Sequence, residues 1–592
     1  MKNLILCGLM AVSGVVFSDA LEKELMDRPM PVREIETSKT VLASDFGAVP
    51  NTGKNMLPAL RKALDEVVAS PEPVLLKLEP GTYLLDTDEV RDHCLTFADL
   101  EDVVFDGCGA EFIVKNPRMG AIMIDRCKRI IVKNISFDYD PLPYAQGWVT
   151  KVYPDKGFDI RLTDNSPEMD LPYFKQALRQ WGAFYDRDNP VLAKEGSDNW
   201  VQFRGWEKIG DRQYHINAYK GVAEVGDAYV QLARENACRA VMMRDSEDVT
   251  LEGLTVYACP SGPYVGRACS NVGIFNCKVL IKPGRWIGSN ADAVHFPWNR
   301  IGPWVEGCQF DGVCDDAVNI YSYRSWITAQ PKSDTLNIES SGFPLTEAIQ
   351  GATAWVFNPE DGSLIAEAVV QSLDLKNDQK AVVTLNKKIP KLELEPANEA
   401  NRPMIYFSCY LGEKFVFRNN LVRFSRRYGI VVPTQRGIIE GNTFDRCAGC
   451  GISSSNHQRA RKDIDMFTGG NLIIRNNTIV DCEQQTQANV MNTFGSISLS
   501  VLRTSHEPAE WNALSNVLVE NNTIKNFRTT GIRLLNGGTN VVIRGNRITA
   551  AEDAPLTAGV PNCGILIQKS QPVILENNVI EDSRPIEKTV IQ

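Results

Sequence analysis

The sequence predicts an all-β protein, a right-handed parallel β-helix that carries two inserted antiparallel β-barrel-like domains. Two observations support the β-helix. Short runs of alternating apolar residues recur and end in Asn or Gly, at residues 129–134, 248–253, 271–276, 414–420, 437–442, 471–477, 516–522, 540–546 and 572–578. The short spacings are nearly constant, with 22 residues from Asn420 to Asn442 and 24 from Asn522 to Asn546, and longer gaps are typical of the same unit with an inserted loop. Because one unit cannot bury its own apolar face, stacked copies must share a core.

A third observation predicts the inserts. Two stretches interrupt the repeat with hairpin-like alternation, so we expect inserted β domains at residues 141–240 and 326–410. Residues 241–325 between them, and residues 411–592 after them, are expected to form further β-helix rungs. At each corner of the β-helix, we expect an Asn to adopt the left-handed conformation and to bond to the Asn of the next rung.

The N-terminal segment, residues 1–20, is predicted to be an export signal. Lys2 supplies a positive start, Leu4–Phe17 an apolar core, and Ala20 the end of a small-x-small cleavage site. The apolar run is shorter than the ~20 residues that span a bilayer. Cleavage near Ala20 would place the protein in the periplasm or outside a bacterial cell; the alternative is a buried N-terminal strand.

Residues 21–140 are expected to form a capping segment and the first rungs. Apolar residues follow helical spacing from Leu57 to Val67, and strand-like runs follow at Val74–Leu78 and Gly81–Tyr83. An amphipathic helix in this position would cover the exposed edge at the open end of the β-helix.

Composition excludes several classes of protein. The chain has 592 residues, 23% of them charged, and a net charge of −10. An acidic chain without a basic run is not suited to nucleic acid. The 15 cysteines show no disulfide framework. For Cys447 and Cys450, a metal site is one interpretation, and small apolar core residues are the other.

The most informative residues are carboxylates at the start of one repeat strand. Eight residues after Asn420 come Tyr428 and a glycine; eight residues after Gly307 come Asp315 and Asp316. Neither aspartate improves packing, so a structural role alone does not explain them.

One rung earlier, Asp292 aligns with Asp316 and His295 with Asn319, 24 residues apart. Adjacent strands are ~4.8 Å apart, so Asp292 should lie beside Asp316, with Asp315 one position away. Three neighbouring carboxylates should raise at least one pKa. An inverting glycosidase uses such a set, with a protonated acid ~6.5–9.5 Å from the carboxylate that activates water. A calcium site or acidic corners are the alternatives.

These motifs carry a family resemblance. Asn-x-Asp, followed about one rung later by Gly-x-x-Asp-Asp-Ala, resembles the catalytic face of pectin-lyase-like β-helix glycosidases. The Gly-His-Gly motif of polygalacturonases is absent. The chain is more similar to glycoside hydrolase family 110, the exo-acting α-1,3-galactosidases. This similarity covers the start at Asp45–Val49, both inserts, Asn290–Asp292 and Asp315–Asn319.

The resemblance implies an inverting enzyme that releases terminal α-1,3-linked galactose from blood-group B type or linear Galα1,3Gal structures. Carried over, Asp315 is the general acid, and Asp292 and Asp316 activate water. No metal or organic cofactor is implied. The expected partner is a glycan with terminal α-galactose, without nucleic acid or a membrane span, and the inserts could join copies of the chain into a homo-oligomer.

Further residues near the aspartates are candidates for binding the sugar. His295 and Asn319 could bind hydroxyl groups or form a polar ladder, whereas Tyr321 and Arg324 follow the acid-bearing strand. Tryptophans stack on sugars but also anchor loops, and this choice stays open for three of them: Trp286, Trp298 and Trp304.

Three other functions fit the same fold. The first is an inverting hydrolase of another polysaccharide, similar to polygalacturonases. The second is a lyase, which would need an Arg or Lys base near bound calcium. The third is a non-catalytic carbohydrate-binding solenoid, which would tolerate Asn in place of the three aspartates.

Overall fold

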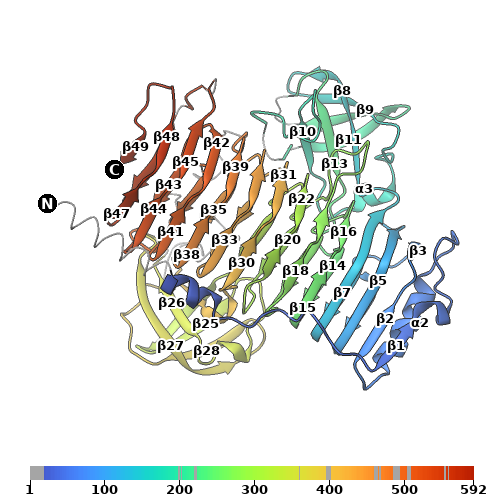
Figure 1. Cartoon of the computed structure of the whole chain (residues 1–592), viewed down its shortest axis with the longest axis horizontal. Helices are drawn as coiled ribbons and strands as arrows, with labels where there is room; N and C mark the ends of the chain where they lie inside the picture. Colours follow the sequence, from blue (N-terminus) through green and yellow to red (C-terminus); the bar gives the residue numbers. More distant parts are fainter. Residues whose placement is uncertain are drawn as a thin grey trace.

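Three rows of parallel strands stack into a single β-helix (Figure 1). The computed structural model describes residues 19–592 except for 198–199, 202, 219–222, 359, 395–401, 456, 459–463, 466–468, 485–493, 503–507, 553–554 and 558. Residues 1–18, which contain most of the predicted export signal, lie outside the described part. No described helix is long and apolar enough to cross a membrane.

Two rows form one 23-stranded sheet, because β5 (Glu101–Val114) and β7 (Lys128–Tyr139) belong to both. The other strands of the first row are β1 (Lys39–Leu42), β2 (Val74–Lys77), β15 (Glu247–Glu252), β18 (Gly273–Phe275), β21 (Trp304–Glu306), β30 (Phe415–Arg418), β33 (Gly437–Glu440), β38 (Leu472–Arg475), β41 (Val517–Glu520), β44 (Val541–Arg544) and β47 (Val573–Glu576). Those of the second row are β3 (Gly81–Leu85), β16 (Thr255–Val256), β19 (Lys278–Val279), β22 (Gln309–Asp311), β31 (Leu421–Arg423), β34 (Thr443–Asp445), β39 (Thr478–Val480), β42 (Thr523–Phe527), β45 (Arg547–Ala550) and β48 (Val579–Glu581).

The third row is a 12-stranded parallel sheet. Its strands are β4 (His93–Ala98), β6 (Gly120–Asp125), β14 (Val241–Arg244), β17 (Tyr264–Arg267), β20 (Val294–Pro297), β23 (Val318–Tyr321), β32 (Ile430–Val431), β35 (Ile452–Ser455), β40 (Ile497–Ser500), β43 (Thr530–Leu535), β46 (Cys563–Gln568) and β49 (Thr589–Ile591). Paired residues form buried apolar columns across the rungs, such as Val294, Val318, Ile430 and Ile452. This shared core is what the repeat predicted.

A ladder of buried asparagines joins the C-terminal rungs. Each side-chain amide donates to Oδ1 of the next ladder residue, at 3.0 Å from Asn442 to Asn477, for example. The expected corner Asn is found before the first row, where Asn471, Asn516 and Asn540 are left-handed, and where Asn516 and Asn540 each donate to Oδ1 of the Asn one rung earlier at 3.0 Å. In the buried ladder, adjacent residues share the two roles. The residue before the ladder position is left-handed, as at Asn476 and Gly441. At Gly441 a Cβ atom would lie 2.6 Å from Asn419 Oδ1, so glycine is required.

Two N-terminal helices cover parts of the β-helix. The predicted amphipathic helix is α2 (Leu57–Val68), which buries its apolar face against the first rungs. Residues 19–26 form a second helix that crosses the first row (Figure 1). Its Leu21 and Leu25 are buried against apolar side chains of four strands: Ile438, Ile473, Leu518 and Val542. Leu21, the first residue after the predicted cleavage site, is therefore part of the packed structure.

The two interruptions of the repeat form separate antiparallel units above and below the stack in Figure 1. The first is a six-stranded sheet of β8 (Tyr144–Tyr153), β9 (Gly157–Leu162), β10 (Gly182–Tyr185), β11 (Phe203–Gly210), β12 (Gln213–Ala218) and β13 (Ala228–Leu232), with α3 (Pro172–Gln176). The second is a closed barrel of β24 (Ser325–Lys332), β25 (Thr335–Ser340), β26 (Thr353–Phe357), β27 (Leu364–Leu375), β28 (Lys380–Leu385) and β29 (Met404–Phe407). Only the second insert therefore closes into a barrel among the described strands.

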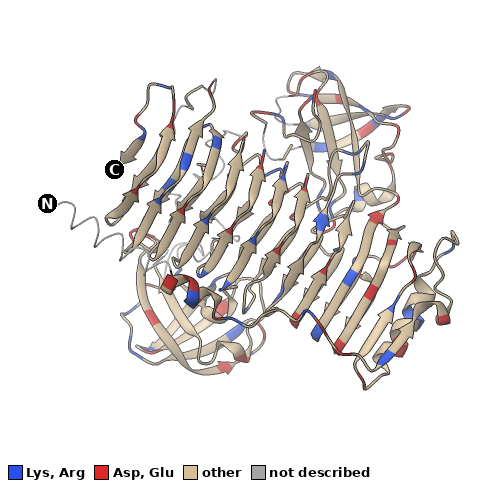
Figure 2. Ribbon diagram, in the orientation of Figure 1, with Lys and Arg blue, Asp and Glu red and all other residues tan. Residues whose placement is uncertain are grey.

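Short elements complete the chain: η1 (Ala43–Phe46), η2 (Glu347–Ile349), η4 (Ser408–Tyr410), β36 (His457–Gln458) and β37 (Ile464–Asp465). Among the described cysteines, all but Cys108 and Cys409 are buried, and none is in a disulfide. Cys447 and Cys450 are core residues; the described residues hold no metal-ligand cluster around them. Acidic and basic residues are interspersed along the ribbon in Figure 2.

Candidate active site

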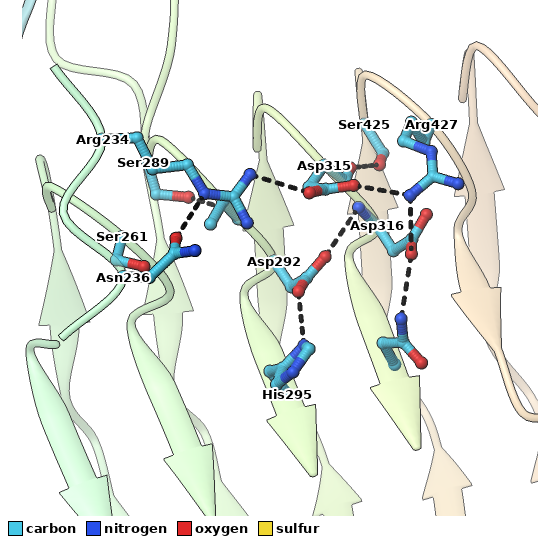
Figure 3. A network of polar contacts seen from close by, with 12 residues as sticks. Arg234, Asn236, Ser261, Ser289, Asp292, His295, Asp315, Asp316, Ser425 and Arg427 are labelled. Carbon is cyan, nitrogen blue, oxygen red and sulfur yellow. Dashed lines mark hydrogen bonds and ion pairs between the residues drawn. The ribbon is translucent and has the colours of Figure 1, made fainter. Parts of the chain in front are cut away.

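The side chains of Asp292, Asp315 and Asp316, here called the aspartate trio, lie together just before two neighbouring strands of the third row (Figure 3). β20 and β23 pair in parallel with His295 opposite Asn319. The same offset sets Asp292 level with Asp316, whose backbone N–H donates a 3.0 Å hydrogen bond to Asp292 Oδ1. The register expected for these two rungs is confirmed.

The alignment to the following rung is wrong by one residue. The pairing of β23 with β32 sets Asp315 level with Arg427 rather than with Tyr428. The slip has a structural cause, because Cys308, and not Gly307, occupies the ladder position of its rung. The correction brings an arginine next to the trio.

Two arginines hold the carboxylate of Asp315 (Figure 3). Arg234 Nη1 lies 2.8 Å from Oδ2, and Arg427 Nη1 lies 2.8 Å from Oδ1. Arg234 follows the last strand of the first insert, and Arg427 precedes β32. The Ser425 hydroxyl donates to the Asp315 carbonyl oxygen at 2.8 Å, which fixes the backbone. Both carboxylate oxygens of Asp315 therefore accept from a cation.

These contacts separate the pKa values of the two adjacent aspartates. Burial alone would raise the pKa of Asp315, but Arg427 and Arg234 outweigh it and hold that pKa at about 2. Burial raises the pKa of Asp316 to about 8 against the opposing effect of Arg427, and the charges of Asp315 and Asp292 add to the rise. These contacts favour an ionised Asp315 and a protonated Asp316.

A chain of hydrogen bonds supports Asp292. His295 Nδ1 lies 2.5 Å from Asp292 Oδ2, and His295 Nε2 lies 3.1 Å from the Tyr321 hydroxyl. The Tyr321 hydroxyl is 3.0 Å from that of Tyr323, near the start of the barrel. If Asp292 is a carboxylate, Nδ1–H donates to it and Nε2 accepts from Tyr321. His295 is thus the direct partner of Asp292 in the resting site, and Tyr321 is a partner of His295.

Asn319, in β23, is a partner of Asp316, which precedes the same strand. Its Nδ2 donates to Asp316 Oδ2 at 3.2 Å, and the Tyr428 N–H donates to Asp316 Oδ1 at 3.3 Å. Asn319 Oδ1 is buried without a hydrogen-bond partner among the described residues. An acceptor of this kind, next to the trio, is suited to a hydroxyl group of a ligand.

The other predicted sugar-binding residues have different surroundings. Arg324 is buried, with its guanidinium 4.1 Å from the centre of the Trp326 ring. The Trp286 ring packs edge-on against Trp148, with centroids 4.9 Å apart, and its backbone N–H donates to Gln146. The described partners of Trp286 and Arg324 are thus outside the trio.

The remaining two tryptophans pack in separate clusters. Trp298 lies 5.1 Å from Tyr323, between ring centroids, and belongs to the core of the second insert. Trp304 is in β21 of the first row, where its ring faces Arg28 and Arg418. Trp304 therefore belongs to a different sheet from the trio.

Sequence reasoning missed the arginines around the trio. Arg234 is 81 residues and Arg427 is 112 residues from Asp315. Arg239, just before β14, is fully buried, donates to the Ser261 hydroxyl, and has its pKa lowered to about 9 by burial, with Arg267 and Arg234 adding. Correct rung alignment would have found Arg427, but no signal in the sequence pointed to Arg234.

The trio is more compact than expected. One oxygen from each carboxylate lies within 4.8 Å of the others, below the ~6.5–9.5 Å expected between acid and base. Neighbouring rungs are only ~4.8 Å apart, and the third aspartate is adjacent in sequence. By distance the trio could surround a cation, but Arg234 and Arg427 already bond both oxygens of Asp315. Arginines provide the counter-charge here.

Comparisons with known proteins agree with this architecture. The family described as "Right handed beta helix region" matches residues 408–586. A Phocaeicola vulgatus protein named alpha-1,3-galactosidase B is 22% identical over 465 residues, covering 70% of this chain and 74% of the relative. A Bacteroides fragilis protein named alpha-1,3-galactosidase A is 20% identical over 585 residues, covering 92% of this chain and 93% of the relative.

Among solved structures, a family 28 exopolygalacturonase from Yersinia enterocolitica is similar, with 11% identity, a TM-score of 0.43, and coverage of 93% of this chain and 77% of that one. The fold class predicted from the sequence, a right-handed parallel β-helix with antiparallel inserts, is confirmed. The names of the relatives indicate a glycosidase of the α-galactosidase type.

Proposed function

We propose that the chain is an inverting exo-glycosidase that releases terminal α-1,3-linked D-galactose, from linear Galα1,3Gal or blood-group B type glycans. The observation that carries the proposal is the aspartate trio, with Asp292 and Asp316 level on neighbouring rungs and Asp315 beside them. The linkage and the sugar come from the names of the relatives.

The proposed roles of the three aspartates are those that the resemblance to glycoside hydrolase family 110 implies. Asp315 donates a proton to the leaving oxygen, and Asp292 and Asp316 together hold and deprotonate the attacking water. Oxygens up to 4.8 Å apart can both hydrogen-bond one water molecule, because each such bond is ~2.7–2.8 Å long. The hydrogen bonds from His295 and from the Asp316 N–H suit Asp292 to the role of an ionised base.

The close spacing also favours a second mechanism. Retaining glycosidases place their two carboxyl groups ~5–5.5 Å apart, and one of them attacks the sugar directly. In the aspartate trio, a nucleophilic Asp292 would give a covalent intermediate and galactose of unchanged configuration. The two mechanisms differ in the anomer that is released first.

Proton NMR of the purified protein with Galα1,3Gal tests activity and stereochemistry together. We expect the β-anomer of galactose to appear first and to mutarotate to the α-anomer later. Early α-galactose would mean retention and would overturn the assigned roles. Absence of turnover on Galα1,3Gal and on a blood-group B trisaccharide would contradict the proposed substrate.

The pH dependence follows from the single proton of the trio. Above the raised pKa of Asp316, about 8, this proton is lost and no acid remains for the leaving group. We therefore expect kcat/KM on Galα1,3Gal to fall about tenfold per pH unit above pH ~8. Initial rates from pH 5 to 10 measure this, with circular dichroism at each pH as the control for folding. A constant kcat/KM up to pH 10 would be incompatible with it.

We also propose that the protein is exported from a bacterial cell, since its proposed substrate is an external glycan. The support is the N-terminal pattern of Lys2, Leu4–Phe17 and Ala20. Mass spectrometry of the protein recovered from the periplasm or medium tests this. A mature N-terminus near Leu21 is expected, and an uncleaved chain in the cytoplasm would contradict it.

A further inference from the structure

The contacts of the resting site favour a proton on Asp316 over one on Asp315, because two guanidinium groups bond Asp315, and this is the reverse of what the proposed reaction needs. The general acid, Asp315, must carry a proton, yet both of its oxygens accept hydrogen bonds from guanidinium groups. Asp316, which should act with the base, is the carboxyl that holds the proton, because burial raises its pKa. The hydrogen-bond partners of Asp315 must therefore change, and Asp315 must gain a proton, before catalysis.

The two arginines are not equivalent. Arg427 Nη1 bonds Asp315 at 2.8 Å and already lies 3.5 Å from Asp316 Oδ2, so it can move from one aspartate to the other with little displacement. Arg234 forms an ion pair with Asp315 alone among the described carboxylates. Release of Asp315 by Arg234 would leave a buried cation without its carboxylate and its Nη1 without the acceptor it has now, which is costly unless another acceptor arrives.

The position of Arg234 allows one end of its guanidinium to change partner. Its Nε donates to Asn236 Oδ1 at 2.8 Å, and its guanidinium carbon lies 4.9 Å from the centre of the Trp181 ring. These contacts hold the group in place while Nη1 is directed at Asp315 (Figure 3). Because Arg234 follows the last strand of the first insert, this insert positions one of the two arginines that bond Asp315.

We propose that Arg234 is a positioning residue that exchanges Asp315 for a hydroxyl oxygen of the entering galactoside, and that this exchange moves the proton of the trio from Asp316 to Asp315. The proposal rests on the proposed function. One N–H···O bond from Arg234 to Asp315 breaks and one to a sugar hydroxyl forms. The proton leaves a carboxyl oxygen of Asp316 and bonds to one of Asp315, with Arg427 moving toward the newly ionised Asp316.

In this exchange, binding of the substrate causes Asp315 to become protonated. Without a glycan, Asp315 is ionised and cannot protonate a leaving group. With a glycan, Arg234 contacts the sugar in both the ground state and the transition state. Loss of such a contact raises KM and leaves kcat nearly unchanged, whereas loss of a group needed only in the transition state lowers kcat.

Steady-state kinetics on Galα1,3Gal test this with Arg234→Met, Arg234→Lys and Arg427→Met. For Arg234→Met we expect KM to rise about 10- to 100-fold with kcat within about threefold of the wild type. Arg234→Lys should recover most of the lost affinity, because it keeps the charge. Arg427→Met should instead lower kcat at least about 100-fold, because no cation would then stabilise ionised Asp316. Arg187→Met removes an arginine of the first insert that pairs with Glu224 and Asp227. It controls for a general loss of stability of this insert and should leave KM and kcat unchanged.

The outcomes separate this proposal from the proposed function. If the wild type hydrolyses Galα1,3Gal with inversion but Arg234→Met lowers kcat at unchanged KM, the exchange is wrong and the function stands. The same holds if Arg234→Lys fails to recover KM while its circular dichroism matches the wild type. If the wild type does not hydrolyse Galα1,3Gal, both proposals fall.

Discussion

Replacing Asp315 by Asn is expected to lower kcat on Galα1,3Gal by roughly 10²- to 10⁴-fold, the usual contribution of a general acid. Asn cannot supply a proton to the leaving sugar, whose hydroxyl is a poor leaving group. A 2,4-dinitrophenyl α-galactoside needs no such proton, so its hydrolysis should fall far less. The ratio of the two effects, measured from initial rates, identifies Asp315 as the proton donor.

The matched control is Asp374→Asn, because Asp374 lies on the exposed face of the barrel and pairs only with Lys376 in the described structure. It should leave both rates unchanged. If Asp315→Asn depressed both substrates equally, the role of Asp315 would be positional. If Asp315→Asn retained full activity on Galα1,3Gal, a residue other than Asp315 would be the acid.

The sequence contains enough information for the β-helix because its rungs repeat one motif, at a spacing of 22 or 24 residues where no long loop is inserted. Asn442 and Asn477 belong to one buried ladder, and Ile439 and Ile474 in the strands before them lie in the shared core. The pairing of Asp292 with Asp316 follows from the same rule, since no insert separates β20 from β23. The repeat in the sequence therefore predicts which residues of neighbouring rungs are in contact.

The prediction failed where an insert, or a different residue at a corner, makes the rung-to-rung register unreadable in the sequence. The barrel, from β24 to β29, lies between Asp315 and Arg427, which are 112 residues apart, and Cys308 takes the ladder position that Asn occupies elsewhere. Arg234 follows an insert whose orientation no repeat determines. These two arginines set which aspartate holds the proton, so the sequence predicts the trio but not its protonation.

The split between Asp315 and Asp316 has a further consequence for interpreting the trio. A set of three isolated carboxylates would repel one another and share protons nearly equally. Here Arg234 and Arg427 bond one member, whereas Asp316 receives only an amide, a backbone N–H and a more distant guanidinium. Neighbouring charges thus give chemically identical side chains different protonation states in the resting site.

Replacing Asp292 by Asn should likewise lower kcat on Galα1,3Gal by roughly 10²- to 10⁴-fold, because water loses its base. Asp292→Ala should show the same loss and leave space beside His295 and Asp316 for a small anion. With added azide, we expect activity to return and the product to be β-galactosyl azide, since azide attacks from the side of the missing water. Product configuration is measured by NMR.

The configuration of the azide product decides between the two mechanisms. If Asp292 were the nucleophile of a retaining enzyme, azide would replace it in the first step and would also give the β-azide, so the wild-type product must be compared. Wild-type release of β-galactose together with a β-azide from Asp292→Ala requires inversion with Asp292 as base. Wild-type release of α-galactose with the same azide would make Asp292 a nucleophile, and the hydrogen bond from His295 would then orient the attacking carboxylate rather than the base.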